Sequence, residues 1–192
     1  MERFPALRRL MALTGAHEAE DDHIMEQAGT TQQDVRDLEG KYLTFALGDE
    51  TYGLGILKVQ EIIRVMPVTR VPRTQSYVRG VINLRGKVIP VMDLRIKFGM
   101  DSHEDTVQTC IVVTQVEREG AKTTIGLVVD RVAEVVDIRA EQIELPPTVA
   151  WDTESSYVVG MGKVADKVVQ LLGIEQVVQG VGEIHDHPQS QA

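Results

Sequence analysis

The chain has 192 residues, of which 43% are hydrophobic, 26% charged and only 4% aromatic, and its formal net charge is −9. This composition is that of a globular protein, and no apolar run reaches the ~20 residues of a membrane span. The single cysteine, Cys110, excludes an internal disulfide. It is expected to be a buried, inert thiol of an intracellular protein. The charge is uneven, because residues 58–97 carry a net +7 and residues 101–175 a net −8, which indicates either an ordinary solvated surface or two docking faces of opposite charge.

The two ends differ from the middle of the chain in their sequence pattern. Residues 1–39 lack strand alternation and are expected to be an N-terminal extension, largely disordered or forming a short helix. Residues 181–192 are expected to be a disordered tail. The folded body therefore spans about residues 40–180.

Within the body, short aliphatic runs alternate with turn residues, which is typical of β-strands. The hairpin turns are expected at 48–50, 85–87 and 119–121, and Asp93 is expected to cap a short helix, Leu94–Phe98, that ends at Gly99. The predicted strands are Tyr42–Leu47, Thr51–Ile56, Val81–Arg85, Lys87–Met92, Cys110–Val116, Thr123–Val129 and Val158–Val164.

An internal repeat organises these strands. Residues 77–92 match residues 157–172 without a gap, with Tyr, Gly and Lys identical, and residues 53–63 match 126–136. We therefore predict a mainly β fold with a few short helices, built as two small five-stranded β-barrels from repeats at about 40–100 and 101–180. Because units of ~60 residues are marginal alone, the two are expected to pack as one body.

Few residues in the body have the pattern of a catalytic or metal site. All five histidines lie in the end segments or in the loop between the repeats, and neither GxGxxG nor GxxxxGK[ST] occurs. Asp93 and Asp130 each end a strand and could form an acid–base pair, but a helix cap and a strand-end turn are the favoured interpretations. A carboxylate-based enzyme remains a remote alternative; we expect no enzyme, no metal and no cofactor.

Nucleic-acid binding is also disfavoured. The chain is acidic overall, and its basic residues are not interleaved with aromatic rings that could stack on bases. The remaining class is a protein that binds other proteins.

Two charged residues stand out as candidates for a protein contact. Arg85 ends the predicted strand Val81–Arg85 and precedes Gly86, so it is either a solvated strand end or an interface anchor. Glu61 shares a strand face with Val59 and Ile63, so it either pairs internally, for example with Arg85, or borders an apolar groove. Gly80 and Gly160 are equivalent in the repeat, where a backbone conformation, close approach by a partner, or both require glycine.

Four blocks in this order resemble the CheW family of chemotaxis adaptor proteins, over about residues 41–179. They are residues 45–62, residues 77–95 with Asn-Leu-Arg-Gly at 83–86, residues 125–135, and Tyr157-Val-Val-Gly160. The resemblance implies two intertwined or abutting β-barrels and a non-enzymatic adaptor that couples methyl-accepting chemoreceptors to the histidine kinase CheA. It also implies a cytoplasmic protein without membrane insertion, associated with receptor arrays at the inner face of the membrane.

The resemblance assigns residues to each partner. The receptor tip would be bound by Ile56, Val59, Glu61, Arg79, Gly80, Arg85, Gly126, Val132 and Val135, and the regulatory domain of CheA by Glu144, Val149 and Trp151. Trp151 is either a lid on the second barrel or an interface anchor. Gly173 stands where the fourth block often has Asp, which weakens a helix cap. An adaptor of a pilus-motility or developmental pathway would have the same sequence features.

Overall fold

The computed structural model describes residues 35–118, 120–146 and 157–179 and confirms a mainly β fold with a few short helices. The elements are β1 (Gly40–Leu47), β2 (Glu50–Gly55), η1 (Ile56–Lys58), β3 (Val59–Arg64), β4 (Val78–Leu84), β5 (Lys87–Asp93), α3 (Leu94–Lys97), β6 (Cys110–Arg118), β7 (Ala121–Val129), β8 (Arg131–Ile138), η2 (Ala140–Gln142), β9 (Ile143–Glu144), β10 (Val158–Val164), β11 (Lys167–Leu172) and α4 (Ile174–Val177).

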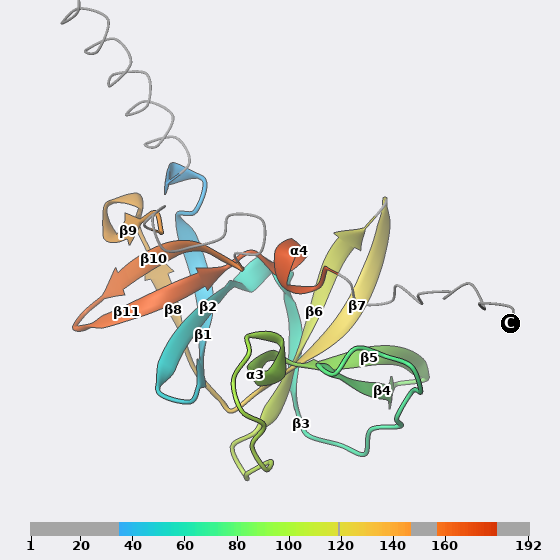
Figure 1. The fold of residues 1–192 in the computed structure, drawn as a ribbon. Coiled ribbons are helices and arrows are strands. Elements are labelled where there is room, and N and C mark those ends of the chain that lie inside the picture. Colours follow the sequence, from blue (N-terminus) through green and yellow to red (C-terminus); the bar gives the residue numbers. More distant parts are fainter. Residues whose placement is uncertain (1–34, 119, 147–156, 180–192) are drawn as a thin grey trace, which may run out of the picture.

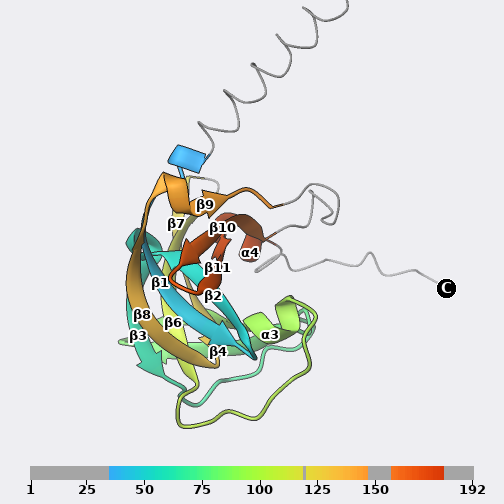
Figure 2. The same ribbon diagram turned by 90° about the vertical axis from the view of Figure 1, so that its left-hand side faces the viewer.

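The strands form two sheets. Sheet A has the order β8-β1-β2-β11-β10-β9, and sheet B has the order β3-β6-β7-β5-β4. Sheet A lies to the left in Figure 1 and sheet B to the right, with α3 and α4 near the middle. Turned to its left side, the molecule shows β8 beside β1 at the front, with strands of sheet B behind them (Figure 2).

The sheets do not follow the two halves of the sequence repeat. Sheet A combines the β1–β2 hairpin of the first copy with β8, β10 and β11 of the second, and sheet B combines β3, β4 and β5 of the first with the β6–β7 hairpin of the second. The expected split of strands at about residue 100 is therefore replaced by an exchange of hairpins. The chain crosses between sheets twice, through η1 and through the single residue Asp130.

The repeat is nevertheless accurate in register. The parallel pair β5–β7 aligns Val91 with Gly126, and the parallel pair β2–β11 aligns Gly53 with Leu171, which are the equivalent positions in the other copy. A Cβ on Gly126 would lie 2.8 Å from Ile111 Cγ2, and one on Gly53 2.9 Å from Val169 Cγ1. Both glycines are therefore needed for close packing in the middle of a sheet.

Three groups of buried side chains hold this arrangement together. One lies within sheet B and includes Ile82, Val91 and Ile111. A second lies within sheet A and includes Ile138 and Leu171. The largest draws on both sheets and both short helices, and its members include Leu43, Phe45, Leu54, Met92, Leu94, Leu127, Leu172 and Ile174. The two units thus share more core than either has alone, as expected for marginal units.

Several predicted elements need correction. The predicted strands included none at β8, β9 or β11, and β3 was expected only through the alternation of residues 59–63. The Val81–Arg85 strand was predicted to end one residue too late, because Arg85 lies in a turn with φ +52°. Cys110 is partly rather than fully buried.

The Asp93 cap is confirmed, since its side chain accepts hydrogen bonds from the backbone N–H groups of Arg95 and Ile96. Gly173 at the equivalent position gives α4 no side-chain cap. Residues 1–34 of the N-terminal extension, the C-terminal tail and the turn residue Glu119 lie outside the described residues, whereas residues 35–39 are described and Leu38 packs against sheet A. The outer domain boundaries near residues 40 and 180 stay a prediction.

Candidate functional site

Glu61 and Arg85 form an ion pair that joins the two edge strands of sheet B. Glu61 lies on β3 and Arg85 directly follows β4, and these are the two edge strands of this sheet. The Arg85 Nη2 atom donates to Glu61 Oε2 at 2.7 Å. The Glu61 side chain is 25% exposed and that of Arg85 78%. Of the two alternatives for Glu61, the pairing with Arg85 is the one observed, but it lies at the surface, where an ion pair adds about 0–1 kcal/mol to stability.

The backbone at Arg85 is unusual for an arginine. Its φ of +52° and the φ of +83° at Gly86 place both residues in the left-handed region, as in a type I′ turn. The Asn83 Oδ1 atom accepts a hydrogen bond from the Gly86 N–H at 2.9 Å and so supports the turn. The left-handed region costs a side-chain-bearing residue about 1–2 kcal/mol, and Asn tolerates it better than Arg. Arg85 thus occupies a position where Asn would be more stable.

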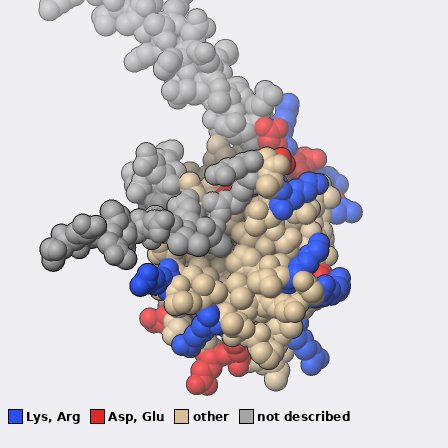
Figure 3. All heavy atoms as spheres, turned by 90° about the vertical axis from the view of Figure 1, so that its right-hand side faces the viewer, with Lys and Arg blue, Asp and Glu red and all other residues tan. Residues whose placement is uncertain are grey.

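The apolar residues assigned to the receptor side lie on two different edges. Ile56 and Val59, at the crossing into β3, and Val132, at the start of β8, are partly buried against the core shared by the sheets. Val135 lies further along β8 and is 50% exposed, as is Ile62, its equivalent on β3, at 45%. In Figure 3, charged side chains lie mainly around the edge of a broad uncharged surface.

The two glycines of the predicted receptor surface have structural roles. Gly80 is buried, has φ +139°, and a Cβ there would lie 2.1 Å from the backbone oxygen of Thr69. Gly126 is buried beneath Ile111, as described above. The conformational interpretation of Gly80 is therefore confirmed, while Gly160 has negative φ and is restricted only by the side chains of Leu38 and Ile143.

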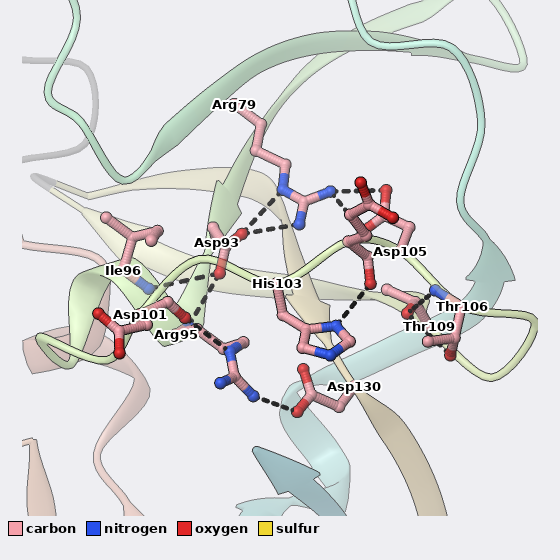
Figure 4. A network of polar contacts seen from close by, with 11 residues as sticks. Arg79, Asp93, Arg95, Ile96, Asp101, His103, Asp105, Thr106, Thr109 and Asp130 are labelled. Carbon is pink, nitrogen blue, oxygen red and sulfur yellow. Dashed lines mark hydrogen bonds and ion pairs between the residues drawn. The ribbon is translucent and has the colours of Figure 1, made fainter. Parts of the chain in front are cut away.

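Arg79 lies apart from the Glu61–Arg85 pair. Arg79 precedes Arg85 by six positions along nearly extended chain, which corresponds to a distance of about 20 Å. Its guanidinium is held on two sides: Nε and Nη2 donate to Asp93 Oδ2 at 2.9 and 2.7 Å, and Nη1 donates to both oxygens of Asp105 at 2.8 Å (Figure 4). Sequence reasoning missed Asp105, because it lies in an exposed loop that has no periodic pattern.

The same network answers the question of an acid–base pair. Asp93 binds Arg79 and caps α3, while Asp130 accepts from Arg95 Nη1 at 2.6 Å and from the Gly48 N–H at 2.7 Å. Arg95 lies between the two carboxylates in Figure 4. Each carboxylate therefore accepts hydrogen bonds from an arginine and from backbone N–H. For Asp93 this agrees with the favoured interpretation as a helix cap.

A second contact that the sequence did not reveal joins the two copies. The ammonium group of Lys97 lies 4.2 Å from the ring centroid of Tyr77 and 5.3 Å from that of Tyr157, which are equivalent residues of the repeat. Lys97 Nζ also donates to the backbone oxygen of Gln179 at 3.2 Å. Burial lowers the pKa of Lys97. The identity of the two tyrosines was a usable signal, but nothing in the repeat indicated Lys97, whose equivalent is Val177.

The residues assigned to the kinase are only partly described. Glu144 is exposed on β9 and forms an ion pair with Lys163 at 2.5 Å. Val149 and Trp151 lie outside the described residues, and so does the choice between a lid and an anchor for Trp151.

Other chemistry has little support in the described part of the chain. There, no group of three or more His, Cys, Asp or Glu residues could hold a metal ion. Burial raises the pKa of the Cys110 thiol, which favours the unreactive protonated form. Among the same residues, no helix is long and apolar enough to cross a bilayer.

Comparisons with known proteins agree with this geometry. A family model described as the CheW-like domain matches residues 41–181. The chemotaxis protein CheW of Klebsiella aerogenes is 36% identical over 138 residues, which cover 72% of this chain and 81% of that protein. CheW of Helicobacter pylori is 34% identical over 153 residues, covering 79% and 88%. The crystal structure of the scaffolding protein TtCheW from Thermoanaerobacter tengcongensis matches with a TM-score of 0.65 at 36% identity, covering 76% of this chain and 96% of that one.

Proposed function

The chain belongs to the CheW family, and on this premise we propose that it is an adaptor of chemotaxis signalling that couples chemoreceptors to the histidine kinase CheA. The adaptor needs no catalytic group, which agrees with carboxylates that are committed to arginines and backbone N–H groups. It binds its partners at the cytoplasmic face of the membrane, in receptor arrays. A pathway of pilus motility or development would use the same surfaces.

The observation that carries the receptor contact is the exposure of the Arg85 guanidinium. Its side chain is 78% exposed, and its partner among the described residues, Glu61, lies at the surface. The left-handed backbone alone does not mark a contact, because Ala165 at the equivalent turn position has φ +50°. Arginine is enriched among interface hot spots because its fork can bind carboxylates and amide oxygens of a partner. We therefore assign Arg85 to the contact with the receptor tip.

Apolar residues near the two sheet edges complete the receptor surface. Ile62 and Val135 occupy equivalent positions of the repeat, and both are about half exposed. Ile56, Val59 and Val132 lie deeper, against the shared core, where they keep the edge strands in place. A helical receptor tip would bury exposed apolar area at Ile62 or Val135 and form ion pairs with Glu61 and Arg85.

The remaining assigned residues have other roles. The guanidinium of Arg79 is bound by two aspartates about 20 Å from Arg85 and so lies outside the proposed receptor contact, while Gly80 and Gly126 are fixed by packing within sheet B. On the kinase side, the exposed Glu144 with Val149 and Trp151 forms the contact to the regulatory domain of CheA.

Replacing Arg85 by Asn tests the proposal, because it separates binding from stability. Asn followed by Gly is the preferred sequence of a type I′ turn, so R85N should raise stability by about 0.5–1 kcal/mol. The loss of a hot-spot arginine should weaken binding to a receptor cytoplasmic fragment by about thirtyfold, or ~2 kcal/mol. Calorimetric titration with the receptor fragment and with the CheA regulatory domain gives both affinities.

The second hairpin provides a matched control. Ala165 occupies the equivalent turn position with φ +50°, so A165N should stabilise the protein equally and leave receptor affinity unchanged. If R85N binds the receptor fragment as tightly as the unmodified protein, Arg85 is not a contact residue. If neither partner binds the unmodified protein, the adaptor function itself is wrong.

A further inference from the structure

A cavity of about 890 Å³ lies beside Arg79, between the loop that precedes β4 and the loop that follows α3. Its size is in the range of small-molecule sites. Six of its sixteen lining residues are apolar and the others are polar or charged; the apolar ones are Val65, Met66, Val68, Val71, Val78 and Ile96. Arg79, Asp93 and Asp105 line it as well, while neither Glu61 nor Arg85 does. The cavity is therefore separate from the proposed receptor contact.

Arg79 is held in a fixed orientation within this cavity. The Asp93 carboxylate, whose side chain is only 7% exposed, binds Nε and Nη2 and is itself fixed by the backbone N–H groups at the start of α3. The guanidinium plane is thus set by a buried partner, and the remaining edge of the fork, Nη1, is presented to the side of the 101–109 loop (Figure 4). A fixed fork of this kind suits the geometry of a carboxylate.

A carboxylate of the chain already occupies that edge. Asp105 bonds Nη1 through both oxygens, but it belongs to a loop whose residues 101–108 are all exposed. Of its other hydrogen bonds, the one from Arg95 Nε to the backbone oxygen of Asp101 joins the loop to α3, whereas those between Thr106 and Thr109 lie within the loop. An external carboxylate that displaced Asp105 would leave the charge inside the cavity unchanged, and the apolar wall would receive whatever apolar group it carried.

We propose that this cavity is a binding site for a carboxylate that bears an aliphatic group, and that Asp105 is an internal substitute for the carboxylate of the ligand. The ligand is either a small aliphatic acid or the C-terminal carboxylate of a peptide that ends in an apolar residue. Binding exchanges one charge-assisted pair for another, so its affinity comes mainly from the apolar wall and is weakened by competition with Asp105.

The test compares acids with their amides on the full-length protein. The probes are 4-methylpentanoate and the peptide Ala-Ala-Leu, each also prepared as the uncharged amide, and binding is followed by ¹H–¹⁵N NMR, including the Arg79 Nε–H signal. The acids should shift the signals of Arg79 and of the loops at the cavity with a dissociation constant on the order of 1 mM, and the amides should not. Which of the two acids binds more tightly identifies the source of the ligand.

Two variants make the result specific. D105N removes the competing charge and should tighten binding of the preferred acid by about tenfold. D101N changes the charge of the same loop by the same amount without touching Arg79, and should leave the affinity unchanged. If neither acid shifts these signals in the unmodified protein or in D105N, or if the amides bind as well as the acids, the proposal is wrong.

Discussion

Lys97 places a positive charge between two tyrosines that the repeat makes equivalent, and two effects act on that charge in opposite directions. Burial lowers the pKa of Lys97 in the folded protein, whereas the faces of Tyr77 and Tyr157 attract the cation. If burial dominates, the unfolded chain binds more protons than the folded one at pH values between the folded pKa and the usual 10.5. Stability due to this group then rises with pH through that window.

Replacing Lys97 by Met isolates the effect, because Met keeps the unbranched stem and has no charge. We expect the stability difference between the unmodified protein and K97M to shift in favour of the unmodified protein as the pH rises from 8 to 10.5. Urea unfolding of both proteins at several pH values measures it. Since the raised pKa values of Tyr42 and Tyr52 affect both proteins alike, they cancel in the difference. A shift in the opposite direction would show that the tyrosine faces outweigh burial.

At the scale of elements, Gly80 allows the backbone of Thr69 to lie against β4, the edge strand of sheet B. The backbone N–H and oxygen of Val81, next to Gly80, exchange hydrogen bonds with Thr69 at 2.8 and 2.9 Å, and the equivalent residue of the other copy, Met161, pairs with Glu144 of β9. The linker before each hairpin therefore covers the free edge of that hairpin, which prevents pairing with a foreign strand.

Substituting Gly80 by Ala should disturb this cover severely. The added Cβ would approach the Thr69 oxygen to 2.1 Å at a φ of +139°, and we expect a loss of about 3 kcal/mol in unfolding free energy. Gly55 is a matched control, because a Cβ there meets nothing within 4 Å and G55A should change stability by no more than about 0.5 kcal/mol. Urea midpoints of the two variants give the comparison, and equal midpoints would contradict the assigned role.

The elements also show what the sequence could and could not predict. The hairpin turns at 48–50 and 85–87 and the Asp93 cap were predictable because glycine and aspartate there have local physical reasons. β8 was missed because Asp130 joins it to the preceding strand without turn residues, and β3 was recognised only by its alternation, without bounds, because η1 joins it in the same way. At the site, strand alternation was enough to suggest the Glu61–Arg85 pair. The Arg79–Asp105 pair was not predictable, since a strand end and an irregular loop have no common pattern.

For the whole molecule, the exchange of hairpins was beyond the sequence for a different reason. Val91 can align with Gly126 or with the equivalent Gly53, and the repeat makes the two pairings locally alike. Only the short crossings decide, because η1 spans three residues and the second crossing one. These crossings carry β3 and β8 into the opposite sheet and leave each hairpin with partners from the other copy.

Cutting the chain between the copies tests this exchange. Residues 1–100 alone lack β6 and β7, which lie between β3 and β5 in sheet B, so this fragment should be unfolded by circular dichroism. The fragment 101–192 lacks β1 and β2 and should behave likewise. Expressed together, the two should form a folded heterodimer. A fragment 1–100 that folds alone as a monomer would contradict the exchange.

The two crossings also determine how the molecule carries mechanical load. A force applied to β3 is transmitted along the main chain through η1 into β2, and a force on β8 passes through Asp130 into β7. Each edge strand is thus tied by covalent bonds to the centre of the opposite sheet, and Lys58 adds an ion pair from η1 to Glu175 on α4 at 2.6 Å. The largest core group, which draws on both sheets, joins them as well. A partner that pulls on one edge therefore loads the opposite sheet through the main chain and through the shared core.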